Sequence, residues 1–207
     1  EIIYWEWDFG DFSFLGQEED VAHTYSENGT YNVELTITSD KGCKNSVSSI
    51  AIVNDRPEVD FTTENVCINE ISYFNDFSTV EDAEIVQWIW NFGDGNTSSF
   101  ENPTNTYLEG NDYEIYLGVV SNKLCSSSLI KDIQIYSLPE ANFLVDNQIC
   151  ENEEVKFVDL SSSEDGIVSV WKWNFGDFTT SVLSDPYHTY YSSNAFDVSL
   201  EIESEFG

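Results

Sequence analysis

Residues 88–94 read WIWNFGD, and this stretch decides the fold because it occurs three times at a fixed spacing. Residues 5–11 read WEWDFGD and residues 171–177 read WKWNFGD, so each copy begins 83 residues after the previous one (88 − 5 and 171 − 88). All six tryptophans of the chain lie inside these three copies. The repeat predicts a tandem array of small domains, since about 80 residues can enclose a core of their own.

Two prolines mark where repeats begin. Pro57 and Pro139 each open a short segment that ends in a phenylalanine, Phe61 or Phe143. Short connections between the repeats predict limited bending between them. Aligned on these positions, the chain divides into a first repeat without its initial strands, a complete second repeat and a third repeat without its last strand, at residues 1–56, 57–138 and 139–207.

The pattern of apolar residues predicts strands. Apolar and polar residues alternate over residues 31–37, 113–119 and 196–202, the period of a half-buried strand. A turn at Asp40-Lys41-Gly42 separates the first of these from residues 47–53 and reads as a hairpin. Because no segment keeps a period of 3.6 residues, we predict an all-β chain. Its tandem immunoglobulin-like antiparallel β-sandwiches would have about seven strands per repeat.

Charge excludes two classes of partner. The chain carries 39 acidic and 7 basic residues, a formal net charge of −32. Such a field repels nucleic acid and anionic membrane surfaces, and no stretch approaches the roughly 20 apolar residues of a membrane span. Two interpretations of the acidic residues stay open, a solvated coat that keeps the array soluble and a set of calcium sites.

Four cysteines recur as two types. Cys67 and Cys150 are 83 residues apart, and Cys43 and Cys125 are 82 apart. A third member of the second type would fall at about position 208, so we expect the chain to be part of a longer protein. Two cysteines per repeat predict disulfides in an oxidising compartment, and the lack of CxxC spacing argues against zinc. Two pairings stay open: Cys67 with Cys125 inside the second repeat, or a bridge between adjacent repeats.

The repeats resemble the PKD (polycystic kidney disease) domain. That family has a WDFGDG motif, then an HxY element, then a strand with the pattern GxYxVxLxV. Residues 88–95, 102–107 and 113–117 of this chain read WIWNFGDG, NPTNTY and YEIYL. The departures from the family pattern are Asn91 and Asn174 for its first aspartate, Phe12 and Phe178 for its last glycine, and Asn105 where His23 and His188 stand.

The resemblance implies immunoglobulin-like sandwiches that act as extracellular spacer or interaction modules. The acidic variety with paired cysteines is similar to repeats of giant surface adhesins of gliding bacteria. It implies a location at the cell surface, on the outside of a bacterium.

The motif residues have a structural interpretation and a functional one. Two tryptophans on one strand could stack on sugars, but their alternation with exposed residues favours core positions. Each glycine would supply a backbone angle closed to other residues, and each following aspartate would accept backbone N–H groups. The motif residues are Trp5, Trp7, Gly10, Asp11, Trp88, Trp90, Gly93, Asp94, Trp171, Trp173, Gly176 and Asp177.

Catalysis is not expected from this chain. The only histidines are His23 and His188, and Asn105 at the equivalent position of the second repeat cannot exchange protons. That position therefore calls for a side chain that forms hydrogen bonds rather than for a catalyst. The sequence requires no cofactor. Calcium is the candidate ion, with Asp94 and Asn96 in the turn and Asp55, Glu58 and Asp60 between repeats as candidate ligands.

These observations predict a structural or adhesive segment of a large secreted cell-surface protein. It would form an acidic rod or filament that spaces or presents a binding region, in the manner of a gliding-motility adhesin. Its partners would be neighbouring repeats, surface polysaccharide or other cell-surface proteins. The alternative is a carbohydrate-binding or spacer array accessory to a secreted hydrolase, with Tyr187, Tyr190 and Tyr191 as a candidate solvent-facing row.

Overall fold

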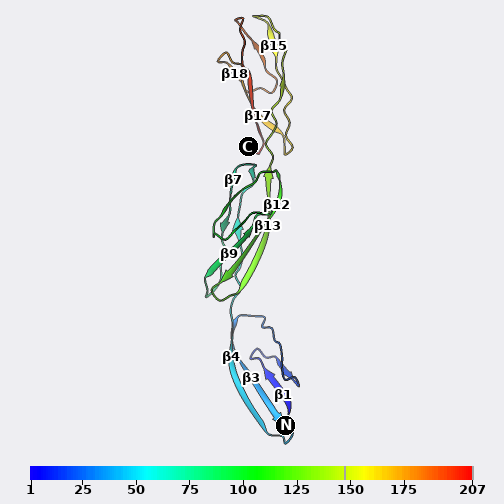
Figure 1. Cartoon of the computed structure of the whole chain (residues 1–207), viewed down its shortest axis with the longest axis vertical. Coiled ribbons are helices and arrows are strands. Elements are labelled where there is room, and N and C mark those ends of the chain that lie inside the picture. The colour runs from blue at the N-terminus through cyan, green and yellow to red at the C-terminus, as the bar shows by residue number, and fades with distance from the viewer. Residues whose placement is uncertain (147, 207) are drawn as a thin grey trace. The chain divides into compact units, whose positions relative to one another are not determined.

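The computed structural model describes residues 1–146 and 148–206, and it builds them from β-strands and turns (Figure 1). No helix occurs among these residues, so none of them forms a helix that could cross a membrane. Two compact units are present. The first contains residues 1–60, 77–88 and 118–129, and the second contains residues 61–76, 89–117 and those from 130 onward. The all-β prediction is confirmed.

The first repeat forms one antiparallel sheet with the strand order β2-β1-β3-β4. In the central pairing, Trp5 lies opposite Ile37 and Trp7 lies opposite Leu35. The predicted hairpin is present, and the alternating residues 31–37 lie inside its first strand. The strands are β1 (Ile2–Asp8), β2 (Phe14–Gly16), β3 (Gly29–Ser39) and β4 (Lys44–Val53).

The second repeat has a five-stranded sheet, in the order β10-β9-β12-β13-β6, and two small two-stranded sheets, β11-β7 and β5-β8. All pairs with a described register are antiparallel except β6 with β13, which run parallel. The strands are β5 (Phe61–Thr62), β6 (Val66–Cys67), β7 (Ile71–Tyr73), β8 (Asn75–Asp76), β9 (Ile85–Asn91), β10 (Thr97–Ser98), β11 (Thr104–Thr106), β12 (Asn111–Ser121) and β13 (Ser126–Tyr136).

The third repeat repeats this plan with a three-stranded sheet, β18-β17-β20, and two small sheets, β14-β16 and β15-β19. The strand predicted over residues 196–202 begins only at Ser199, whereas its equivalent β12 starts at Asn111. The strands are β14 (Phe143–Leu144), β15 (Glu154–Lys156), β16 (Val158–Asp159), β17 (Val168–Asn174), β18 (Thr180–Ser181), β19 (Tyr187–Thr189) and β20 (Ser199–Ser204).

An aromatic core joins the layers of the second and third repeats. Trp90 on β9 is fully buried, with its ring centre 5.2 Å from that of Phe61 and 5.8 Å from that of Phe74. Trp173 on β17 is packed in the same way against Phe143 and Phe157, at 5.1 and 5.5 Å. Aromatic pairs at such distances contribute about 0.5–1.5 kcal/mol each beyond the burial of their area.

In the second and third repeats the two tryptophans of the motif differ in burial, whereas Trp5 and Trp7 of the first repeat are both half-buried. The indole N–H groups of Trp90 and Trp173 donate to the carbonyls of Phe100 and Leu183, at 3.0 and 2.9 Å. These bonds satisfy the polar atom that each core indole takes out of water. The first tryptophan of each pair, expected in the core as well, is only half-buried; this applies to Trp5, Trp88 and Trp171.

Candidate functional site: the aspartate turn of each repeat

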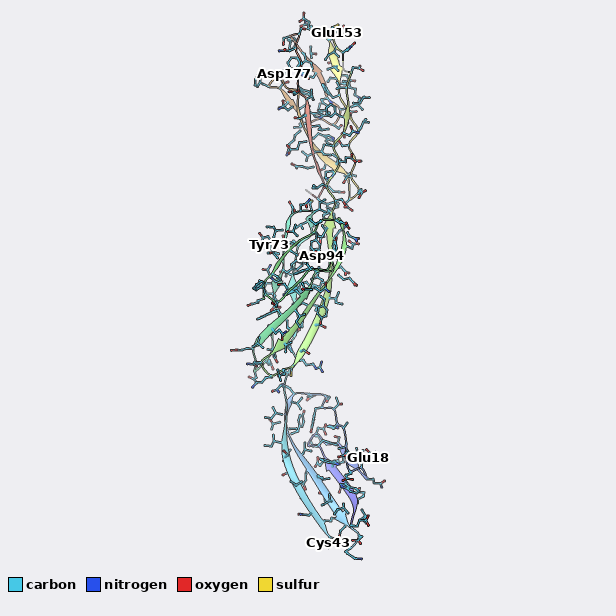
Figure 2. All side chains as sticks on the ribbon, viewed as in Figure 1. Glu18, Cys43, Tyr73, Asp94, Glu153 and Asp177 are labelled. Atoms are coloured by element: carbon cyan, nitrogen blue, oxygen red, sulfur yellow. The ribbon has the colours of Figure 1, made fainter. Side chains whose placement is uncertain are left out.

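Each motif copy leaves its strand through the same turn, which we call the aspartate turn (residues 8–13, 91–96 and 174–179). Figure 2 labels Asp94 and Asp177, the central aspartates of two of these turns. The turn begins with a side-chain oxygen that accepts the glycine N–H two residues later, at 2.9, 2.9 and 3.0 Å. That oxygen belongs to Asp8, Asn91 and Asn174. Because the bond needs only an acceptor, asparagine can replace aspartate here.

The glycine of the turn is required by both angle and space. Gly10, Gly93 and Gly176 have φ values of +77°, +78° and +80°, in the left-handed region. A Cβ at these positions would lie 2.8, 3.0 and 2.7 Å from a backbone carbonyl oxygen of the neighbouring strand segment. Any other residue would therefore be strained in its own backbone and would push that segment away.

The aspartate after the glycine binds two partners with its two oxygens. Oδ1 of Asp11 accepts the N–H of Ser13 at 3.0 Å and also contacts the Ser13 hydroxyl, while Oδ2 lies 2.7 Å from Nε2 of His23. Asp177 has the same arrangement, with the N–H of Thr179 at 3.1 Å and Nε2 of His188 at 2.8 Å. The carboxylate thus closes the turn and ties it to the segment that carries the histidine.

The second repeat uses amides in place of the hydroxyl and the imidazole. Oδ1 of Asp94 accepts the N–H of Asn96 at 2.9 Å, and its Oδ2 accepts the side-chain amides of Asn96 and Asn105, at 2.9 and 2.8 Å. Asn105 is buried, with 9% of its surface exposed. The position that holds histidine in the other repeats therefore supplies a donor to a carboxylate, in line with the interpretation made from the sequence.

A tyrosine two residues beyond the histidine position completes the cluster. The hydroxyls of Tyr25, Tyr107 and Tyr190 donate to the carbonyls of Phe9, Phe92 and Phe175, at 3.1, 3.1 and 3.0 Å. In the first and third repeats the imidazole also stacks on a phenylalanine ring. The ring centres are 4.0 Å apart for Phe9 with His23 and 4.3 Å apart for Phe175 with His188.

The hydrogen bonds change the acidity of the cluster. The Ser13 hydroxyl, with smaller contributions from His23 and the Ser13 N–H, lowers the pKa of Asp11 to about 2 against the opposing effect of burial. Burial also opposes ionisation of Asp177, but bonds from Thr179 and His188 outweigh it and lower that pKa. Burial raises the pKa of Tyr107 to about 12. Asp11 and Asp177 are therefore anions that serve as fixed acceptors.

The Ser13–His23–Asp11 cluster contains the residue types of a hydrolytic triad, but its geometry differs. In a triad the imidazole lies between the hydroxyl and the carboxylate and takes the hydroxyl proton. Here Asp11 lies between the other two and bonds to both, and Ser13 Oγ is 3.5 Å from the imidazole nitrogen. The hydroxyl proton is directed to the carboxylate, so the cluster is arranged to hold a turn.

The candidate calcium ligands lie in two different units. Asp94 and Asn96 are together in the second unit, where the amide N–H groups around Asp94 occupy the directions that a cation would use. In the first unit, Oδ2 of Asp55 accepts the amide of Asn28 at 2.6 Å, and Glu58 pairs through its backbone with Thr79. The N–H of Asp60 donates to the Ser78 hydroxyl. Over residues 1–146 and 148–206, no three acidic, histidine or cysteine side chains gather closely enough to hold a metal ion.

The structure does not bring Cys67 and Cys125 together. Cys67 is the register partner of Tyr136 at the end of β13, whereas Cys125 immediately precedes the start of that strand. The 11 residues of β13 span roughly 35 Å at about 3.3 Å per residue, and a disulfide needs Cα atoms within about 7 Å. Among the described residues the cysteines are thiols, and burial raises the pKa of Cys67.

Two features of the site were not predicted from the sequence. Phe12 and Phe178 follow the aspartate with φ values of +71°, and both side chains are fully exposed. The signal in the sequence was that both phenylalanines stand where the family has a glycine, a residue that favours positive φ. Tyr190 was expected in a solvent-facing row with Tyr187 and Tyr191, but it is buried in the core, so this row does not exist as predicted.

Known proteins share these repeats. The family profile described as "PKD domain" matches residues 1–53, 54–134 and 136–207. Collagenase ColA of Bacillus cereus is 37% identical over 54 residues, which are 26% of this chain and 6% of that protein. Collagenase ColA of Clostridium perfringens is 40% identical over 79 residues, which are 37% of this chain and 6% of that protein. This chain thus spans about 6% of the length of these relatives.

Solved structures include single domains of similar sequence. The PKD1 domain of Vibrio anguillarum Epp is 26% identical and has a TM-score of 0.38, with 40% of this chain and 95% of that chain covered. The PKD1 domain of the Vibrio cholerae metalloprotease PrtV is also 26% identical, with a TM-score of 0.37 and coverage of 39% and 98%. The family matches follow one another along nearly the whole sequence, and the chain therefore belongs to the PKD domain family, in three tandem copies.

Proposed function

We propose that this chain is a non-catalytic, tandem-repeat segment of a larger extracellular protein, in which the repeats space or present a binding region. The observation that carries the proposal is the aspartate turn. In every repeat its carboxylate bonds to donors of its own repeat, so the most regular polar residues of the chain serve the fold. PKD domains are non-catalytic accessory modules, which agrees with this role.

The acidic surface supports an extended array. We place the repeats at residues 1–56, 57–138 and 139–207. With a net charge of −32, electrostatic repulsion favours separation of these repeats from one another. The finer form of the proposal is an acidic rod on a bacterial surface, part of an adhesin of the kind that gliding bacteria use. Neighbouring repeats, surface polysaccharide and other surface proteins are its partners.

Small-angle scattering of the whole chain, in calcium and then in chelator, tests the rod, and free thiols are counted on the same sample. An elongated particle in both conditions supports a spacer. If the particle becomes stiffer in calcium, the result supports cation bridges at junction residues such as Asp55 and Glu58. A compact particle with the repeats folded against one another would overturn the rod.

The matched relatives favour a second candidate, an array that accompanies a secreted hydrolase, because both are collagenases. In that case the chain would contact the substrate of a neighbouring catalytic domain. Tyr187 and Tyr191 are 60% and 79% exposed and are the remaining aromatic candidates in the third repeat. Retention of the chain on insoluble polysaccharide or collagen, lost in Tyr187→Ala and Tyr191→Ala but kept in Tyr73→Ala, would favour this candidate over a passive spacer.

A further inference from the structure

The second repeat carries a groove on the outer face of its five-stranded sheet, in which β9, β12 and β13 lie side by side (Figure 1). Ile115 and Leu117 of β12 are fully buried in the core, so the residues that alternate with them lie on the opposite, outer face. The groove has a volume of about 520 Å³, within the range of ligand sites. Each of its wall residues belongs to a repeat that has another repeat on either side. The walls include Gly93 and Gly95 of the aspartate turn, Asp112, Glu114 and Tyr116 of β12, and Ile130 of β13.

Three positions of this groove differ from those of the other repeats. Gly95 has open space around it, whereas a phenylalanine stands at the same position in both other repeats. Tyr116 has no aromatic counterpart, and the apolar Ile130 corresponds to a serine of the first repeat. The combination of an open turn, an aromatic ring and an apolar wall is thus particular to the second repeat. The counterparts are Phe12 and Phe178 for Gly95, Glu34 and Ser199 for Tyr116, and Ser48 for Ile130.

The groove combines uncompensated negative charge with an exposed ring. Asp112 and Glu114 are exposed, and among the residues that the structure describes neither carboxylate is paired with a basic side chain. Tyr116 and Ile130 are 36% and 56% exposed. A planar cation can lie over a tyrosine ring while its N–H groups donate to neighbouring carboxylates. The guanidinium group of arginine has both properties, whereas the ammonium group of lysine is a more strongly hydrated point charge.

We propose that this groove binds an arginine side chain from an exposed segment of a partner protein. The guanidinium group lies over the ring of Tyr116 and donates to the carboxylates of Asp112 and Glu114. The side-chain oxygens of Asn91 and Asn111 already accept backbone N–H groups, at 2.9 and 3.0 Å. Their amide N–H groups at the groove are left to donate to backbone carbonyls of the partner segment.

Charge favours this occupant over others. A chain with a net charge of −32 attracts cationic segments and repels anionic polymers, and it also repels a second copy of itself. A neutral sugar could stack on Tyr116, but it would leave both carboxylates without a counter-charge. The open space at Gly95 lets the backbone of the partner segment approach the turn. The spacer role does not require this site, so failure of the inference would leave that role in place.

A titration followed by nuclear magnetic resonance tests the site. The whole chain, labelled with a nitrogen isotope, is titrated with acetyl-Gly-Arg-Gly-amide at low ionic strength, and its backbone amide shifts are recorded. We expect saturable shifts at residues 93–95 and 112–116. The apparent dissociation constant should be about fivefold below that of acetyl-Gly-Lys-Gly-amide. The equivalent turns at residues 10–12 and 176–178 are internal controls and should show no saturable shift.

Two groove variants are compared with one matched control. Tyr116→Ser introduces the residue of the third repeat, and Asp112→Asn with Glu114→Gln removes both charges. Each should raise the dissociation constant of the arginine peptide by about fivefold or more. The control, Glu81→Gln with Glu101→Gln, removes the same charge from two exposed positions outside the groove and should change the constant by less than about twofold. The dispersion of the amide spectrum checks that each variant is folded.

Three results would overturn the inference. Equal shifts in all three repeats would show that the peptide is only attracted by the overall charge of the chain. A dissociation constant that is unchanged in folded Tyr116→Ser would remove the ring from the site. Saturable shifts at residues 112–116 with cellobiose, but none with the arginine peptide, would assign the groove to a neutral sugar instead.

Discussion

The hydroxyl of Tyr107 donates a hydrogen bond to the backbone carbonyl of Phe92 across 3.1 Å, in the interior of the second repeat. The bond joins the segment after β11 to the start of the aspartate turn. The same bond occurs between Tyr25 and Phe9 and between Tyr190 and Phe175. It satisfies a carbonyl that would otherwise be buried without a donor, so the tyrosine hydroxyl is as much a part of the repeat as its ring.

Removal of that hydroxyl should destabilise the second repeat. Tyr107→Phe keeps the ring and leaves the Phe92 carbonyl without its donor, so we expect a loss of about 1–2 kcal/mol in the free energy of unfolding. Tyr113→Phe removes a hydroxyl that bonds the exposed carbonyl of Glu109 and should cost less than about 0.5 kcal/mol. Urea unfolding measures the stability of both variants. Equal losses would show that the buried hydrogen bond of Tyr107 contributes no more to stability than the exposed one of Tyr113.

The two glycines of the second turn should respond differently to alanine. Gly93→Ala combines a left-handed backbone with a Cβ 3.0 Å from the Glu114 carbonyl oxygen, and we expect it to cost about 2–3 kcal/mol. Gly95 has φ +93° but open space around it, so Gly95→Ala should cost only about 1 kcal/mol of backbone strain. Thermal unfolding of the two variants distinguishes them. A cost as small at Gly93 as at Gly95 would argue against the close approach.

A glycine in place of Phe178 should stabilise the third repeat. A phenylalanine at φ +71° costs about 1–2 kcal/mol, while the greater freedom of glycine in the unfolded chain removes about 0.5–1 kcal/mol of the benefit. We therefore expect Phe178→Gly to gain roughly 0.5–1 kcal/mol. Phe178→Ala removes the same ring but keeps the strained angle, so it should bring no gain. A gain from alanine equal to that from glycine would trace the effect to the exposed ring instead.

Acid should weaken the first repeat through Asp11. Its pKa is lowered from 3.8 to about 2 in the folded chain, so its ionised form stabilises the fold above about pH 4 and this contribution disappears as the pH falls to about 2. The stability advantage of the natural chain over Asp11→Asn should therefore shrink between pH 4 and pH 2. Asp20→Asn controls for the loss of one exposed charge.

Hydrogen exchange of β1 and β3 at each pH reports on this repeat alone. An advantage that stays constant from pH 4 to pH 2 would contradict the assignment of the lowered pKa to Asp11.

The fold could be predicted from the sequence because its signals are local and occur in several copies. The alternation around Leu35 and the turn at Gly42 predict a hairpin from neighbouring residues alone, and β3 and β4 confirm it. The burial of Trp90 follows from the same alternation. Those arguments needed no knowledge of which strands meet across the sandwich.

Long-range pairings could not be predicted in that way. Cys67 lies beside Tyr136 because β6 pairs in parallel with β13 across about 70 residues of sequence, and this removes Cys67 from the end of the strand next to Cys125. Similarly, the period of residues 196–202 predicts a strand over the whole stretch, but β20 begins only at Ser199. Pairing between strands that are distant in sequence, rather than the β-propensity of local residues, decides such positions.

The first acceptor of the aspartate turn is a charged carboxylate at Asp8 and a neutral amide at Asn91 and Asn174, with bonds of 2.9–3.0 Å in all three cases. At this position the turn requires an oxygen atom that accepts a hydrogen bond, and it does not require a charge. The charge of such a repeat can therefore be changed at this position, by exchange of an amide for a carboxylate, while the aromatic interior remains unchanged.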